Sequence, residues 1–134
     1  MCAELLAASQ AVLTGGRDAE TRLTRIDSLV LAPHVVGDLV AYAPLMISRL
    51  HERLGDDALA LAALRRRTYM SEWPRYLATM LREEARLAER AGDLAATRTA
   101  FSHYLAYRDS SAGLAPELAA VRRRIGTEGG TAPR

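Results

Sequence analysis

Residues 52–64 read ERLGDDALALAAL, and residues 89–101 read ERAGDLAATRTAF. Each segment contains a Glu-Arg pair, a Gly-Asp step and then an apolar or Ala-rich run. Glycine closes the last turn of a helix in the left-handed conformation, and aspartate caps the helix that follows. The repeated segment therefore predicts the same helix–turn–helix unit twice, and a third copy is expected around Gly16.

Apolar residues recur with helical spacing along almost the whole chain, and no segment shows the sustained alternation of a surface strand. The expected helices cover residues 4–13, 36–54, 72–91 and 115–125, and others begin at Asp18, at Asp56 or Asp57, and at Asp93. Pro44 is expected in the first turn of the regular part of its helix, where its missing N–H costs little. The predicted fold is all-α: an α-solenoid of about three antiparallel helix pairs plus a C-terminal capping helix.

One domain is expected over residues 1–125, because a single hairpin cannot bury its apolar face and stacked hairpins can. The repeats are placed at residues 2–32, 36–68 and 72–109, the capping helix at 115–125, and a Gly-rich disordered tail at 126–134.

Composition narrows the class of protein. The chain has 134 residues, a net charge of +2 and one cysteine, Cys2, so it cannot form an intramolecular disulfide. No apolar run approaches the length of a membrane-spanning helix, and no apolar signal segment precedes Cys2. A cytoplasmic protein that does not engage the membrane is expected.

Residue patterns typical of catalysis are missing from the sequence. The three histidines, His34, His51 and His103, lack metal-ligand spacing, and a chain without lysine has no phosphate-binding P-loop. Glu83 and Glu84 are adjacent, so on a helix they point about 100° apart. We therefore expect no enzymatic activity, no catalytic residue, no cofactor and no metal, and we interpret His51 as a packing or surface residue.

The chain resembles the tetratricopeptide-repeat family over residues 36–108. The residues that carry the resemblance are Ser48, Gly55-Asp56, Ala60 and Leu64 in the middle repeat, and Ala85, Gly92-Asp93, Thr97 and Phe101 in the last repeat. Two positions depart from the family's pattern, because Glu84 stands where a large apolar residue is usual and Tyr104 where a small one is usual. The resemblance implies a non-enzymatic module that binds other proteins.

A second resemblance covers RRRTYMSEWPRYLATMLREEARLAERAGD (residues 65–93) and AFSHYLAYRD (residues 100–109). These segments are similar to C-terminal repeat regions of bacterial regulatory proteins, such as serine/threonine kinases and transcriptional activators. This resemblance implies a role in bacterial signalling or regulation.

Arginines recur at every fourth position in the predicted helix 72–91, at Arg82, Arg86 and Arg90. In the family that the chain resembles, the first helix of each repeat lines a concave groove. The candidate partner-binding groove therefore consists of Tyr42, Leu45, Arg49, Arg53, Thr79, Arg82, Arg86 and Arg90. Guanidinium groups on neighbouring helices suit the carboxylates of an acidic protein or peptide partner.

Three alternatives remain open at this point. The arginines could form a solvated helix face that Glu52, Glu83 and Glu89 partly neutralise. The chain could also be a nucleic-acid-associated transcriptional regulator that uses its Arg-rich faces, including residues 65–67 and 122–124. Self-association through the first hairpin is a further possibility.

Overall fold

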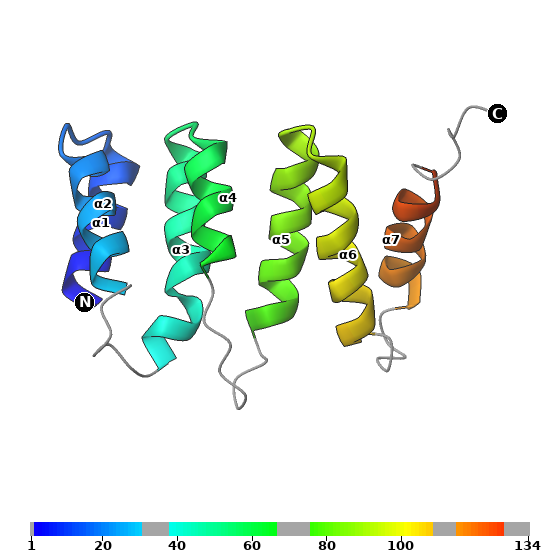
Figure 1. Cartoon of the computed structure of the whole chain (residues 1–134). Coiled ribbons are helices and arrows are strands. Elements are labelled where there is room, and N and C mark those ends of the chain that lie inside the picture. The colour runs from blue at the N-terminus through cyan, green and yellow to red at the C-terminus, as the bar shows by residue number, and fades with distance from the viewer. Residues whose placement is uncertain (1, 31–37, 67–75, 109–114, 128–134) are drawn as a thin grey trace. The chain divides into compact units, whose positions relative to one another are not determined.

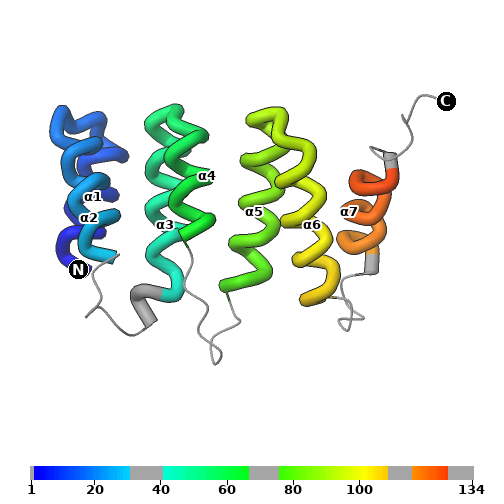
Figure 2. Tube along the Cα trace, in the orientation of Figure 1, coloured from blue at the N-terminus to red at the C-terminus, as the bar shows by residue number. Residues whose placement is uncertain are grey.

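A computed structural model describes residues 2–30, 38–66, 76–108 and 115–127 of the chain. Within these residues all regular structure is helical, which confirms the predicted all-α class (Figures 1 and 2). The helices are α1 (Cys2–Thr14), α2 (Ala19–Val30), α3 (Asp38–Arg53), α4 (Asp57–Arg65), α5 (Leu77–Arg90), α6 (Leu94–Arg108) and α7 (Ala115–Thr127). None of these described helices combines the length and apolar character that crossing a membrane requires.

The chain divides into two compact units, unit 1 (Met1–Tyr76) and unit 2 (Leu77–Arg134). The expectation of one continuous repeat domain stays a prediction. The predicted tail over 126–134 begins too early, because α7 continues to Thr127. Residues 128–134 lie outside the described part of the chain, as do 31–32, 36–37, 67–68, 72–75 and 109 of the predicted repeats.

Three turns of the chain share one hydrogen-bond pattern. Gly15, Gly55 and Gly92 all have positive φ angles, of 67°, 82° and 74°. In each turn, the N–H of the residue after the glycine bonds the carbonyl oxygen five residues earlier, at distances of 2.7, 3.0 and 2.9 Å. This pattern is the Schellman motif, in which a glycine without a Cβ ends the helix. In the first copy Gly15, rather than the expected Gly16, adopts the left-handed conformation.

The helices that follow the turns begin in two different ways. The Asp56 carboxylate accepts a 2.9 Å bond from the N–H of Leu59, and the Asp93 carboxylate accepts a 3.0 Å bond from the N–H of Ala96. These bonds are the predicted N-caps. Asp18, which was expected to cap α2, instead accepts a bond from the guanidinium of Arg22 one turn later. Its carboxylate therefore supports α2 through a charged pair one turn apart.

Pro44 does not lie in the first turn of its helix, which corrects the prediction. Helix α3 begins at Asp38, six residues earlier, and Pro44 is inside it. An interior proline removes one backbone hydrogen bond and costs about 3 kcal/mol. Ala43, Pro44 and Leu45 are all buried, so we attribute the helix over these residues to packing that offsets this cost.

Unit 1 consists of two helical hairpins that share one core. Helix α1 packs on α2, α3 packs on α4, and α3 also contacts both α1 and α2. The buried residues of this core are Leu5, Ala8, Ala11, Val12, Ala19, Leu23, Ile26, Ala43, Ile47, Leu50 and Ala63. An ion pair between Asp27 of α2 and Arg66 at the end of α4 joins the two hairpins. The sequence did not predict this ion pair, because it placed Arg66 only in the Arg-rich face of residues 65–67.

Unit 2 consists of the α5–α6 hairpin with α7 packed against α6. Its core contains Ala78, Leu81, Ala85, Ala100, Phe101, Tyr104, Leu118 and Val121. The two residues that depart from the repeat pattern, Glu84 and Tyr104, are both buried. Tyr104 is a member of the unit 2 core.

Candidate functional site

The predicted arginine series lies along one exposed side of α5. Arg82 and Arg90 are exposed and Arg86 is half-buried, at positions that follow one another by a helical turn. Arg82 keeps 50% of its side chain exposed. The structure thus places the three guanidinium groups on one helix at the surface of unit 2.

Carboxylates from two helices hold the first two of these arginines. The Arg86 Nε donates to Glu83 Oε2 at 2.8 Å, on the same helix. Arg82 makes two longer contacts, Nη1 to Glu117 Oε1 of α7 at 3.4 Å and Nη2 to Glu83 Oε1 at 3.9 Å. The neutralising role predicted for Glu83 is confirmed, whereas Glu117 was not anticipated. Of the other residues proposed for this role, Glu89 lies 3.9 Å from Arg124 of α7.

Glu117 is oriented by a hydrogen bond from a buried tyrosine. The Tyr104 hydroxyl donates to Glu117 Oε1 at 2.8 Å. This hydrogen bond is the largest cause of the lowered pKa of Glu117; burial opposes it, and the bond and charge of Arg82, which are smaller effects, lower the pKa further. Burial and the Glu117 carboxylate raise the pKa of Tyr104. At neutral pH the site therefore holds a neutral tyrosine, an ionised Glu117 and a cationic Arg82.

A hollow of about 250 Å³ opens beside these residues, between α5, α6 and α7. Its lining combines three arginines, two carboxylates and an apolar part, and consists of Arg82, Glu83, Arg86, Phe101, Glu117, Ala120, Val121 and Arg124. Phe101 and Val121 are buried members of the unit 2 core. Such a hollow suits a ligand group that is both acidic and apolar, because guanidinium groups surround hydrophobic side chains.

The other predicted groove residues are distributed over both units. Arg49 and Arg53 of α3 are exposed, and neither forms an ion pair with another residue of the described part. Tyr42 is half-buried, and its ring centroid lies 5.6 Å from that of Tyr76. Thr79 of α5 is half-buried too. Leu45 is only 6% exposed, so its side chain offers little surface to a partner.

Comparison with known proteins gives no family. No family model, curated protein or solved structure matches the chain. The resemblance to tetratricopeptide repeats therefore stays a prediction, and the function must be argued from the geometry.

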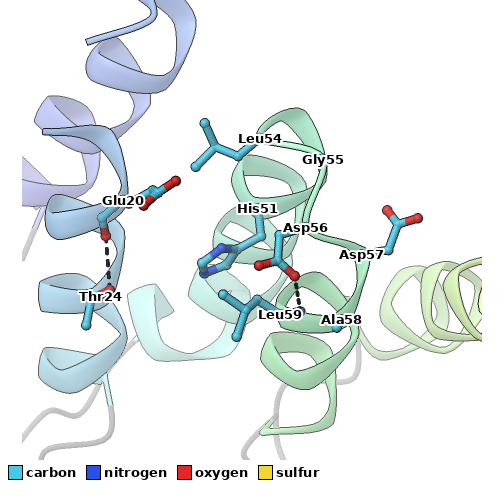
Figure 3. A pocket seen from close by; sticks show the side chains of 9 residues that line it. All are labelled: Glu20, Thr24, His51, Leu54, Gly55, Asp56, Asp57, Ala58 and Leu59. Carbon is cyan, nitrogen blue, oxygen red and sulfur yellow. Dashed lines mark hydrogen bonds between the residues drawn. The ribbon is translucent and has the colours of Figure 1, made fainter. Parts of the chain in front are cut away.

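Unit 1 contains a larger pocket that the sequence did not predict, with a volume of about 570 Å³ (Figure 3). It lies between α2 and the α3–α4 turn and is lined by Glu20, Thr24, His51, Leu54, Gly55, Asp56, Asp57, Ala58 and Leu59. Figure 3 shows the His51 ring extending from α3 toward α2. The sequence predicts only a packing or surface role for His51, because the pocket forms only when Glu20 and Thr24 of α2, distant in sequence, lie opposite it. The sequence offered one signal for this pocket, namely that acidic residues follow closely after a histidine on the inward side of its helix.

His51 has an unusual electrostatic environment. The residue is 5% exposed, and its Nε2 atom is buried without a hydrogen-bond partner. Burial lowers the pKa of His51, and the positive charge of Arg66 adds to this effect, while the charges of Asp27 and Asp56 oppose it. The imidazole is therefore neutral at neutral pH. No cluster of His, Cys, Asp and Glu side chains among the described residues could hold a metal ion.

Proposed function

We propose that this chain is a non-enzymatic helical-repeat module that binds an acidic peptide or helix of a partner protein. The observation that supports the proposal best is the hollow of unit 2, where Arg82, Arg86 and Arg124 surround the apolar side chains of Phe101 and Val121. Acidic side chains of a partner would pair with the guanidinium groups, and an apolar side chain between them would fill the hollow.

Arg82 is the residue that a partner would engage first. Its contacts to Glu117 and Glu83, at 3.4 and 3.9 Å, are long for charged hydrogen bonds, and half of its side chain is exposed. A guanidinium group has five N–H donors, so Arg82 can donate hydrogen bonds to a partner carboxylate without first losing a short internal bond. Glu83 and Glu117 keep the guanidinium group in place until the partner arrives.

In this proposal, the repeat architecture lengthens the binding surface formed by the arginines of unit 2. If α1–α2, α3–α4 and α5–α6 stack as a solenoid with α7 as its cap, α3 and α5 are both first helices of their repeats. Arg49 and Arg53 would then lengthen the binding groove beyond unit 2. A module of this kind fits the bacterial signalling or regulatory proteins that the sequence resembles, and it would act in the cytoplasm.

Replacing Arg82 and Arg86 together tests the proposal. The probe is a short fluorescent peptide of alternating glutamate and leucine, with a glutamine-for-glutamate version as its uncharged match. We expect Arg82→Ala with Arg86→Ala to weaken binding of the acidic peptide by at least about 10-fold, because charge-assisted hydrogen bonds are lost. Binding is measured by fluorescence anisotropy, and circular dichroism checks the fold.

The control removes the same charge elsewhere. Arg17→Ala with Arg25→Ala alters exposed positions of unit 1 outside the hollow and should leave affinity unchanged. Equal binding of the two peptides, or an unchanged affinity in the Arg82 and Arg86 variant, would rule the acidic-peptide site out. Binding of random duplex DNA that weakens steeply with salt would instead favour the nucleic-acid regulator.

A further inference from the structure

The pocket of unit 1 holds a polar atom that lacks a partner. His51 Nε2 is buried and makes no hydrogen bond, while the ring lines the pocket and points toward α2 (Figure 3). Leaving a buried polar atom without a hydrogen bond is unfavourable, because the atom has lost its contact with water and gained no partner. A ligand that donates a hydrogen bond to this nitrogen would supply that partner. The neutral imidazole can accept such a bond when its proton is on Nδ1.

Two carboxylates face the same pocket. The Glu20 side chain of α2 projects toward the space in front of His51, and the Asp56 carboxylate lies beside the ring (Figure 3). Glu20 makes no ion pair within the described residues. Asp56 accepts one bond from Leu59 N–H and can accept more, since a carboxylate has about four acceptor positions. Asp57 also lines the pocket, but Figure 3 shows its carboxylate directed away from His51.

The rest of the lining is compatible with a hydrocarbon chain. Leu54 and Leu59 border the pocket and are partly exposed. The charged residues that line the pocket, Glu20, Asp56 and Asp57, are all acidic. Acceptors at the inner end and leucine side chains at the border would suit a group with several N–H donors on an alkyl stem.

We propose that this pocket binds an alkyl cation with N–H donors, such as the side chain of an arginine presented by a partner peptide. The cation would lie between Glu20 and Asp56 and donate to Nε2 of His51, with its alkyl stem against Leu54 and Leu59. This site is separate from the acidic-peptide site of unit 2 and has the opposite charge preference.

Binding should depend on the protonation of His51. A protonated imidazole would repel the cation and could no longer accept its hydrogen bond. The charged groups that act on His51 are Asp27, Asp56 and Arg66, and Glu20 faces it across the pocket. Since burial keeps His51 neutral, affinity should be full at about pH 7.5 and should fall as the pH drops below the ordinary histidine range, about 6.5.

An NMR titration of the full chain tests the site. The probe is N-acetyl-arginine amide, in which only the guanidinium group is charged, and N-acetyl-citrulline amide is the uncharged match. Ethylguanidinium serves as a free small cation that lacks the peptide groups. We expect the arginine probe to shift the His51 and Asp56 signals, the citrulline probe to leave them unchanged, and Glu20→Gln to weaken binding about 10-fold.

The control variant is Glu4→Gln, which removes a carboxylate from unit 1 outside the pocket and breaks only an exposed 3.3 Å pair with Arg25. It should keep full affinity. Glu20 is exposed, so Glu20→Gln leaves the fold intact. Equal shifts with the citrulline probe, or an unchanged affinity in Glu20→Gln, would refute the cation site. Tighter binding of the arginine probe than of ethylguanidinium supports a peptide-borne ligand, and the reverse order would refute that source.

Discussion

The hydrogen bond between Tyr104 and Glu117 connects the core of unit 2 to the surface that carries the arginines. Tyr104 is 2% exposed and lies on α6, while Glu117 lies on α7 and also contacts Arg82 of α5. One buried hydroxyl thus fixes the carboxylate that positions an exposed guanidinium group. A change at Tyr104 should therefore affect both the stability of unit 2 and the charge of Glu117.

We expect Tyr104→Phe to lower the free energy of unfolding by about 1–2 kcal/mol at neutral pH, because a hydrogen bond to a charged acceptor is lost. The same change should raise the pKa of Glu117, since the tyrosine bond is the main cause of its lowered pKa. A lowered pKa in the folded state stabilises the protein above the unfolded-state pKa and stops doing so as the pH falls through the folded-state value. The cost of Tyr104→Phe should therefore shrink in acid, which urea unfolding at several pH values can measure.

A double-mutant cycle isolates this interaction. In a Glu117→Ala background the hydroxyl of Tyr104 has lost its acceptor, so Tyr104→Phe should cost clearly less than in the original protein. An equal cost in both backgrounds would show that the hydrogen bond does not contribute to stability.

At the scale of single elements, the glycines of the turns and the glycine of α7 have different backbone conformations. Gly92 has a φ of 74°, where a side chain is strained although a Cβ would meet no atom within 4 Å. Gly126 lies inside α7 without a positive φ, and a Cβ there would also meet nothing. The same substitution should consequently have opposite effects at the two positions.

Gly92→Ala should destabilise unit 2 by about 1–2 kcal/mol, because an alanine is forced into the left-handed conformation. Gly126→Ala should stabilise it by up to about 1 kcal/mol, because alanine is the better helix former. Urea denaturation of the two variants and the original chain gives the comparison. A loss of stability in Gly126→Ala would contradict the assignment of that residue to a regular helix.

The sequence predicts these elements well because their signals are local. Helical periodicity and the Gly-Asp steps place the described helices and two of the three expected caps, and turn geometry follows from the glycines. Asp18 does not cap α2 as expected, because Arg22 lies one turn away and competes for its carboxylate. Pro44 does not lie in the first turn of its helix as expected, because its burial within α3 outweighs the preference of proline for a first helical turn.

The candidate sites were less accessible to prediction, because they depend on which helices meet. The arginine series of α5 is visible in the sequence, but Glu117 becomes its neighbour only through the packing of α7. His51 and Glu20 are far apart along the chain, and the contact of α2 with α3 brings them to one pocket. Periodicity indicates that His51 faces inward but not what it faces.

At the scale of the whole molecule, the proposed solenoid makes a prediction about cooperativity. Stacked repeats stabilise their neighbours, so a change in one repeat is felt in the next. Gly92→Ala in unit 2 should therefore lower the hydrogen-exchange protection of amides in α3 and α4 of unit 1. If protection falls only within unit 2, the two units fold independently and the solenoid proposal fails.

The glycine turns also bear on how the chain acquires its fold while it is synthesised. Each turn joins two helices that pack on one another, and chains dominated by such local contacts fold in microseconds to milliseconds. Ribosomes add only about 5–20 residues per second, so the α1–α2 hairpin is complete well before α4 exists. The ion pair between Asp27 and Arg66 can form only after Arg66 has been synthesised. We expect the apolar face of the first hairpin to remain open to solvent until α3 emerges and packs on it, so the nascent chain needs protection from aggregation during this interval of synthesis.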